Sequence, residues 1–453
     1  MSQPSPPESL IGRARRLATG GTASIVGSAL YSNALRIVSS MTLTRLLSAE
    51  AFGVVGIITS VTFILSLLSD VGVFPFVVRH EQGTERDFLD EIWTLRLIRQ
   101  IVLGAIMLAI SVPVAHFIHK PQLAPVIAFW SLSMVVEGLS SMTFATAIRE
   151  QQLWRLTMLE LIVATVQLVV SIAAALLLHT YWALAIAMMG AFGLKAILSY
   201  TMFPGSRRRF VLSRPRAREL WQFSRFIALS SILTLFVMQA DKVALARLMP
   251  LAAYGLYAIA TTLSGAPLTL AHQYVARILY PAYAAAFREA PERLAATFYA
   301  KRRLVVCGFL AAMGGMIGGA PLIIAILYDP RYQAVTPYLQ LVALSTAFYM
   351  PNNAAEECLV AAGRQRYTLY ANIVRALWLV GGGAVAIATH DTMLLVAVFG
   401  LIELVAQLCY WWGLRRIGVL DLREEALGIA ALAGGAGVGW AIARAALRLV
   451  GHF

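Results

Sequence analysis

Long apolar runs recur along the whole chain, separated by short polar or charged segments. Twelve runs are well marked, near residues 22–45, 53–77, 97–116, 123–146, 158–178, 182–203, 224–247, 254–276, 304–328, 337–361, 369–388 and 393–413. A helix of about 20 apolar residues crosses the hydrocarbon core of a bilayer, which is about 30 Å thick. Residues 161–178 (LIVATVQLVVSIAAALLL) lack the polar face that a helix of a soluble protein shows. The pattern predicts an all-α polytopic membrane protein.

The chain repeats itself after about two hundred residues. TRLLSAEAFGVVGI surrounds Arg45, and ARLMPLAAYGLYAI surrounds Arg247, 202 positions later, with Gly53 and Gly255 in register. Each copy lies between two apolar runs, and the period is far longer than the 20–50 residues of solenoid repeats. Many transporters consist of two homologous helical bundles with the substrate path at their interface. We therefore predict two homologous six-helix bundles.

The distribution of basic residues predicts the topology. With a cytoplasmic N-terminus, the short outer loops hold only four of the 37 basic residues, namely Arg45, Lys120, Arg247 and Arg331. Most of the other basic residues then lie in the segments on the opposite side of the membrane, and an excess of Lys and Arg marks the cytoplasmic side. Residues 1–21 are polar and basic and lack an A-x-A cleavage site, which favours a cytoplasmic tail over a signal peptide.

These patterns divide the chain into five parts. We predict a cytoplasmic N-terminal tail at 1–21, an N-lobe of six spans at 22–203, a basic amphipathic cytoplasmic linker at 204–223, a C-lobe of six spans at 224–414, and a C-terminal segment at 415–453. From Pro215 onward we expect the linker to form a helix in the cytoplasmic interface. The last part contains one extra hydrophobic segment, at 426–443.

Composition and motifs narrow the classes of function. Hydrophobic residues make up 59% of the chain and charged residues 13%, against about 45–50% and about 25% in soluble proteins. The sequence shows no Walker motif, D-x-D or G-x-S-x-G, and His116 and His119 have no third zinc ligand nearby. We expect no enzyme activity, no cofactor and no metal. The net charge of +14 suits anionic membrane lipids and requires no nucleic acid.

Ionisable side chains inside predicted spans are candidates for the transport site, because burying them in hydrocarbon is costly. Basic groups attract an anionic headgroup, and a guanidinium matches phosphate oxygens bidentately. The candidates for substrate binding are Arg36, Arg375, Lys195, Arg96, Arg99 and Lys242. Arg36 is the sharpest of them, since it lies about halfway along the first span, where we expect it to face a cavity between the lobes.

Carboxylates inside spans are candidates for coupling transport to an ion gradient, because a desolvated carboxylate titrates near neutral pH. They are Asp70, Glu137, Glu403 and Asp241. The alternative is that several of these charges pair with one another and hold helices together, as Asp241 beside Lys242 suggests.

Three stretches carry a family resemblance: TRLLSAEAFGVVGI, the SDVGV step of the second span, and RELWQFSRF at the entry to the second half. With them the chain resembles, over residues 22–414, the polysaccharide transporters of the multidrug/oligosaccharidyl-lipid/polysaccharide flippase superfamily. The resemblance implies a V-shaped flippase fold of two six-helix lobes with a central cationic cavity. It also implies alternating access that moves a polyisoprenyl-diphosphate-linked oligosaccharide across the bacterial inner membrane.

Two other functions stay open. One is a cation-coupled exporter of drugs or organic cations from the same superfamily, which would favour acidic over basic groups in its cavity. The other is a non-transporting scaffold subunit of a polysaccharide assembly complex. The expected partners of the flippase are the lipid-linked oligosaccharide and membrane lipids, with a polymerase and a chain-length regulator of the same pathway as further candidates.

Overall fold

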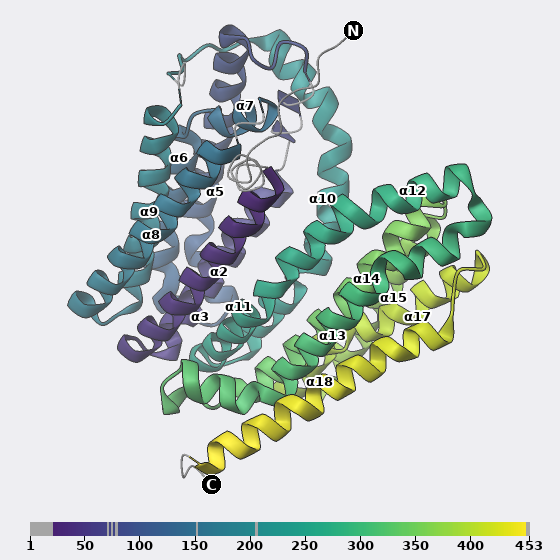
Figure 1. Ribbon diagram of the computed structural model, residues 1–453. Coiled ribbons are helices and arrows are strands. Elements are labelled where there is room, and N and C mark those ends of the chain that lie inside the picture. The colour runs from purple at the N-terminus through teal and green to yellow at the C-terminus, as the bar shows by residue number, and fades with distance from the viewer. Residues whose placement is uncertain are drawn as a thin grey trace, which may run out of the picture. The chain divides into compact units, whose positions relative to one another are not determined.

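The computed structural model describes residues 21–69, 72–73, 76–77, 80–150, 153–203 and 207–449, and all regular structure in these ranges is helical (Figure 1). Nine helical segments of this part of the chain are long and apolar enough to cross a membrane. They are Ala49–Leu68, Arg86–Phe117, Pro121–Leu139, Trp154–Leu178, Tyr181–Thr201, Leu294–Leu327, Arg366–Ala388, Thr392–Arg416 and Leu422–Leu449. The protein is therefore a multi-pass membrane protein.

The chain folds as two compact units. The N-terminal unit comprises residues 1–47 and 58–235, and the C-terminal unit comprises residues 48–57 and 236–453. Two helices, α3 (Ala49–Leu68) and α10 (Arg214–Leu248), contribute to both units. Neither Pro nor Gly interrupts 216–248, so α10 runs unbroken for 35 residues in place of the separate interfacial helix expected from Pro215.

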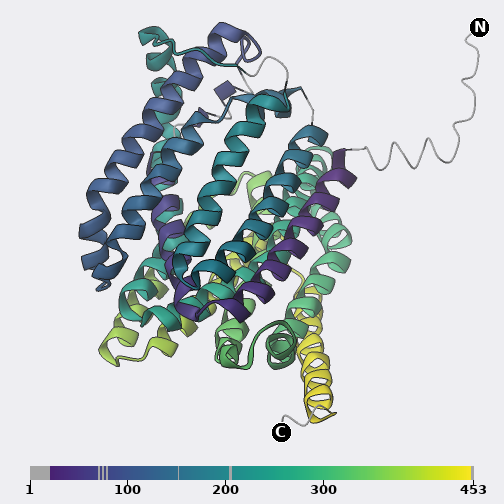
Figure 2. The same cartoon turned by 90° about the vertical axis from the view of Figure 1, so that its left-hand side faces the viewer.

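The N-terminal unit is built on pairs of adjacent helices. Its other α-helices are α2 (Gly21–Leu46), α5 (Arg86–Phe117), α6 (Ala124–Leu139), α7 (Thr143–Arg149), α8 (Leu153–Leu178) and α9 (Tyr181–Thr201). Helix α2 lies along α8, as Figure 2 shows, and Tyr31 Oη is 3.1 Å from Thr165 Oγ1 across that contact. Helices α5 and α6 form a second close pair.

The predicted span at 123–146 is two helices, because the chain turns between α6 and α7. Ser140 has an extended ψ of 141° and ends α6. Three side chains donate to carbonyls at this end: Trp93 and Arg96 to Ser140 O, and Tyr200 to Leu139 O. Carbonyls that a helix end leaves free are thus partly satisfied by side chains of α5 and α9.

The C-terminal unit contains the remaining helices. They are α11 (Leu251–Tyr274), the π-helix η2 (Val275–Leu279), α12 (Tyr280–Glu289), α13 (Leu294–Leu327), α14 (Val335–Ala361), α15 (Arg366–Ala388), α16 (Thr392–Gly400), α17 (Ile402–Arg416) and α18 (Leu422–Leu449). Three short 3-10 turns, η1 (Pro121–Leu123), η3 (Pro291–Arg293) and η4 (Pro330–Tyr332), each precede an α-helix in one unit or the other. The predicted span at 393–413 is interrupted at Leu401, between α16 and α17.

Helix α18 packs along α13, and Figure 1 shows the two side by side. Glycine makes this approach close. A Cβ on Gly314 would collide with Leu432 O, a Cβ on Gly318 with Ala436 O, and a Cβ on Gly435 with Ala311 O. Small residues let membrane helices pack backbone to backbone. The segment predicted at 426–443 is thus part of a 28-residue helix joined to the C-terminal unit.

The two copies of the repeated motif meet each other. A Cβ on Gly53, in the first turns of α3, would lie 3.2 Å from Gly255 N, and one on Gly255, in α11, would lie 3.0 Å from Gly53 N. The same Gly255 position would also collide with Ala49 O. The repeat read from the sequence therefore marks a helix crossing that has no space for a side chain.

A second pair of matched positions ends two helices in the same way. His179 follows α8 with a φ of 52°, and His390 follows α15 with a φ of 53°. This left-handed conformation is typical of the residue that ends a helix, and glycine usually occupies it. The matching turns support the internal repeat at a distance of 211 residues along the chain.

Candidate functional site

A buried ion pair lies in the C-terminal unit. Arg375 Nη2 on α15 is 2.7 Å from Glu403 Oε2 on α17, and the two side chains are 9% and 12% exposed. The break at Leu401 places Glu403 in the first turn of α17. Carboxylates are stabilising at that end of a helix, where backbone N–H groups are free.

Polar side chains from three helices surround this pair. Asn352 Nδ2 on α14 donates to Glu403 Oε2 at 2.7 Å and to the Glu403 carbonyl at 2.8 Å. Arg375 Nη1 donates to Asn372 Oδ1 at 2.8 Å and to Tyr410 Oη at 3.5 Å. A buried charge costs least when it is both paired and hydrogen-bonded, and both conditions hold here.

The network ends at a second carboxylate. Tyr410 Oη donates to Glu356 Oε2 at 3.1 Å. Glu356 lies on α14, one turn after Asn352, and its side chain is half-buried. We call Asn352, Glu356, Arg375, Glu403 and Tyr410 the α14–α17 network.

The structure thus brings together two sequence-predicted candidates with opposite roles. Arg375 was proposed to bind substrate and Glu403 to couple an ion, but each is the other's partner. Sequence reasoning named none of Asn352, Tyr410 and Glu356 as a site residue. Asn352 and Glu356 are four positions apart, about one helical turn, and this spacing in the sequence indicates that they share a face of α14.

Two predicted arginines of the N-terminal unit contact backbone and hydroxyl oxygens. Arg96 is buried, and its Nη2 donates to Glu137 O at 2.9 Å and its Nη1 to Ser140 O at 3.2 Å. Arg99 Nη2 donates to Ser66 O and to Ser69 Oγ, each at 2.9 Å. These contacts hold α5 against the ends of α6 and α3. Asp70, a predicted coupling residue, lies outside the described residues.

The other candidates are scattered. The Glu137 and Lys195 side chains are half-buried, and Lys195 Nζ lies 4.8 Å from the centre of the Phe144 ring. Lys242 Nζ is 3.6 Å from Asp241 Oδ1. Tyr257 Oη donates to Asp241 Oδ2 at 2.6 Å, so this carboxylate has a described partner on α11 as well.

Arg36 stands apart from these. It is the sixteenth residue of the 26-residue helix α2, and its side chain is exposed. No ion pair within the described part of the chain includes it. The ordinary partners of a guanidinium in a low-dielectric setting are phosphate and carboxylate groups.

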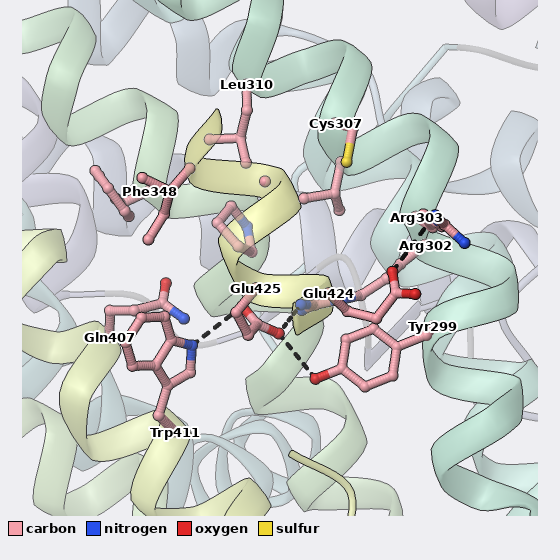
Figure 3. Close-up of a pocket in the computed structure, with 14 residues that line it drawn as sticks. Tyr299, Arg302, Arg303, Cys307, Leu310, Phe348, Gln407, Trp411, Glu424 and Glu425 are labelled. Atoms are coloured by element: carbon pink, nitrogen blue, oxygen red, sulfur yellow. Dashed lines mark hydrogen bonds and ion pairs between the residues drawn. The ribbon is translucent and has the colours of Figure 1, made fainter. Parts of the chain in front are cut away.

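A second buried cluster joins α18 to the C-terminal unit (Figure 3). Glu425, near the start of α18, accepts hydrogen bonds from Arg302, Tyr299 and Trp411. Arg302 and Glu425 are 4% and 6% exposed and form an ion pair. Sequence reasoning did not predict this cluster; the two acidic residues at the start of the final helix were its one signal.

This cluster closes one end of a small pocket. Arg302 Nη1 and both amide atoms of Gln407 are buried there and have no hydrogen-bond partner among the described residues. The free space is about 20 Å³, which is room for about one water molecule. Val306, Leu310 and other apolar side chains form the remaining wall. The pocket is too small for a lipid headgroup or a sugar.

The linker between the lobes is held against the start of α5. Arg216 donates to Glu91 at 2.9 Å and to Glu219 at 2.6 Å. Arg208 pairs with Asp90 at 3.6 Å, and both side chains are buried. Burial lowers the pKa of the Arg208 guanidinium, an effect that the Asp90 carboxylate opposes. The segment 207–219 is thus an ordered part of the N-terminal unit.

Metal binding finds no support in the described residues, which hold no group of three His, Cys, Asp or Glu side chains suited to a metal ion. His116 and His119, the one H-x-x-H in the chain, end α5. His119 has a φ of 57° and closes the helix, as His179 and His390 do.

Comparison with known sequences gives a family and several relatives. Residues 42–337, well over half of the chain, match the family described as "Polysaccharide biosynthesis protein". The chain is 22% identical to the succinoglycan biosynthesis transport protein ExoT of Rhizobium meliloti (strain 1021), over 83% of this chain and 76% of the relative. It is 24% identical to the amylovoran biosynthesis protein AmsL of Erwinia amylovora, over 66% and 77%. It is 21% identical to the lipopolysaccharide biosynthesis protein WzxC of Escherichia coli (strain K12), over 81% and 76%.

Comparison with solved structures shows the fold. The lipid II flippase MurJ in an inward closed conformation superimposes with a TM-score of 0.66 and 10% identity, covering 92% of this chain and 98% of MurJ. An inward-facing multidrug resistance MATE family transporter of the MOP superfamily gives a TM-score of 0.63 and 14% identity, covering 85% and 94%. The predicted all-α polytopic flippase fold is confirmed, while the exact arrangement of six, six and one spans stays a prediction.

Proposed function

Because the chain belongs to the polysaccharide biosynthesis protein family, we propose that it is a flippase for polyisoprenyl-diphosphate-linked oligosaccharides. It moves repeat units from the cytoplasmic to the periplasmic leaflet of the bacterial inner membrane by alternating access, with its N-terminus in the cytoplasm. The relatives support this substrate class, since they are named for succinoglycan, amylovoran and lipopolysaccharide biosynthesis. A polymerase and a chain-length regulator are the further partners that such a pathway implies.

Arg36 is the observation that carries the substrate assignment. A guanidinium in the middle of a membrane helix costs at least about 2.5–3.5 kcal/mol on insertion scales. Arg36 is exposed on α2, which covers the first predicted span, and has no described ion-pair partner, so a bound anionic ligand would supply the compensating charge. A diphosphate does this bidentately. The cargo's sugar and diphosphate cannot enter hydrocarbon unaided, whereas its lipid tail can remain there.

The test measures how fast the purified full-length protein in liposomes flips a labelled polyisoprenyl-diphosphate-linked oligosaccharide. A membrane-impermeant quencher reports the leaflet that the label occupies. We expect Arg36→Ala to lower the flipping rate about tenfold or more, since a charge-assisted contact is lost. Arg36→Lys should keep part of the activity, because the charge survives without the fork.

Arg444→Ala is the matched control. Arg444 is also exposed on an apolar helix, α18, but its guanidinium lies 5.0 Å from the centre of the Trp440 ring, near the helix end. We expect no change in flipping. A normally folded, fully active Arg36→Ala protein would contradict the role of Arg36. A wild-type protein that moves an organic cation and no lipid-linked saccharide would support the exporter, and one that moves neither would support the scaffold.

A further inference from the structure

Glu356 is the less buried carboxylate of the α14–α17 network. Its Oε2 accepts from Tyr410 Oη at 3.1 Å, Tyr410 Oη accepts from Arg375 Nη1 at 3.5 Å, and Arg375 Nη2 donates to Glu403 Oε2 at 2.7 Å. Glu403 is buried, whereas Glu356 is only half-buried. Of the two carboxylates in this chain of contacts, Glu356 is therefore the more exposed.

The charges in the network do not balance. Arg375 and Glu403 neutralise each other, and the ion pairs of the described residues include none to Glu356. An ionised carboxylate with no cation is costly away from water, and it is relieved by a proton or by a bound cation. A metal ion finds no ready set of ligands, because no group of three His, Cys, Asp or Glu side chains occurs among the described residues.

We propose that Glu356 is the proton-binding group of this transporter, and that Tyr410 passes its state to the Arg375–Glu403 pair. The proposal rests on the proposed function for its purpose, since an exchangeable proton is what couples a flippase to a proton gradient. In the step, a hydronium ion gives its proton to a Glu356 carboxylate oxygen and leaves as water. The network changes from one net negative charge to neutral, and no other bond is made or broken.

The groups that face Glu356 explain how the step is transmitted. They are Tyr410 and Glu403 from α17, Arg375 and Thr368 from α15, and Tyr349 and Glu357 from α14 itself. While Glu356 is ionised, the Tyr410 hydroxyl donates a hydrogen bond to it and accepts one from Arg375. Protonation weakens Glu356 as an acceptor and so weakens the tie between α14 and α17. Glu403 keeps its contacts to Arg375 and Asn352, which makes it the anchor of the network, a role different from the ion-coupling role expected from the sequence.

The experiment is infrared difference spectroscopy of the full-length protein in lipid nanodiscs, with pH as the variable and no saccharide present. Protonated carboxyl groups give a separate carbonyl band. We expect Glu356→Gln to lose one titrating carboxyl from that band, while the neighbouring Glu357→Gln keeps it. Tyr410→Phe should keep the band and raise its midpoint pH, because the hydroxyl favours ionised Glu356 by donating to it.

Glu356→Asp guards against a folding artefact, because it remains titratable and should retain a shifted band. The proposal is overturned if the band survives in Glu356→Gln, if it is lost in Glu403→Gln instead, or if sodium at constant pH removes it from the wild type. The proposed function fails separately. If the protein binds this proton but does not flip the lipid-linked saccharide, the proton-binding role of Glu356 stands and the proposed flippase function is wrong.

Discussion

In the C-terminal unit, Arg302 and Arg375 each contact a buried carboxylate, whereas the described contacts of Arg96 and Arg99 in the N-terminal unit are to carbonyl and hydroxyl oxygens. Both arrangements satisfy guanidinium N–H groups away from water. They differ in what remains when one partner is removed. A broken ion pair leaves a whole buried charge, while a lost arginine at a helix end leaves carbonyls that still accept from another donor.

The difference indicates two uses of arginine in one fold. The ion pairs of Arg302 and Arg375 join helices that come from separate stretches of chain, α13 to α18 and α15 to α17. Arg96 instead stabilises the turn between α6 and α7, where the helix C-terminus carries a partial negative charge. The N-terminal unit also contains a buried ion pair, Arg208–Asp90, so the comparison applies to these four arginines. We expect loss of a partner to destabilise the protein more at Arg302 and Arg375 than at Arg96 and Arg99.

The largest effect should follow loss of the Glu425 charge. Glu425→Gln leaves buried Arg302 without a counter-charge, and we expect the free energy of unfolding to fall by about 3–5 kcal/mol. Thermal or denaturant unfolding of the protein in detergent measures this. The matched control is Glu424→Gln, whose partner Arg303 is 58% exposed, and a change within about 1 kcal/mol is expected there.

A double replacement sharpens the same point. Arg302→Met with Glu425→Leu removes both charges, and we expect it to recover most of the lost stability, because apolar groups of similar volume replace buried pairs well. If Glu425→Gln unfolds no more easily than Glu424→Gln, the anchoring role of this ion pair is wrong.

Arg96→Met should lower the free energy of unfolding by less, about 1–2 kcal/mol. Its loss removes two donors, but Glu137 O also accepts from Ser140 N at 3.1 Å and Ser140 O from Trp93 Nε1 at 3.1 Å. The same unfolding measurement checks it beside Glu425→Gln. Equal losses for the two variants would remove the distinction between arginines that pair with a carboxylate and arginines that bind carbonyl oxygens.

The smallest fall in the free energy of unfolding is expected for Trp93→Phe, which keeps an aromatic ring, though a smaller one, and removes one donor to Ser140 O. A single neutral hydrogen bond contributes about 0.5–1.5 kcal/mol. Combined with Arg96→Met, the loss should exceed the sum of the separate losses, because Ser140 O then lacks both side-chain donors. A double-mutant cycle measures that excess, and an additive result would show that the two donors act independently.

Most of the fold follows from hydropathy, since the apolar runs fall on helices. The helix ends that were not predicted lie where contacts with other helices determine the path of the chain. The turn at Ser140 and the break at Leu401 occur inside apolar runs, and a run of apolar residues carries no signal for them. A Cβ on Gly400 would lie 2.8 Å from Leu341 O, so a neighbouring helix constrains the chain just before that break.

The candidate site was predictable as a set of charges but not as pairs. Arg375 and Glu403 were both singled out, yet 28 positions of sequence separate them, and only the packing of α15 on α17 shows that they are partners. Arg302 was missed because basic residues near a helix end look like topology signals. Its partner Glu425 is 123 positions away.

The meeting of Gly53 and Gly255 bears on how a duplicated chain diverges. After a duplication, each copy can usually accumulate substitutions alone, and a larger side chain on one side is accommodated by a smaller one opposite. Here the atoms opposite each glycine include backbone atoms of the other copy, which no substitution can shrink. The two positions therefore cannot compensate for each other, and a larger residue in either copy would force α3 and α11 apart at this crossing within the C-terminal unit.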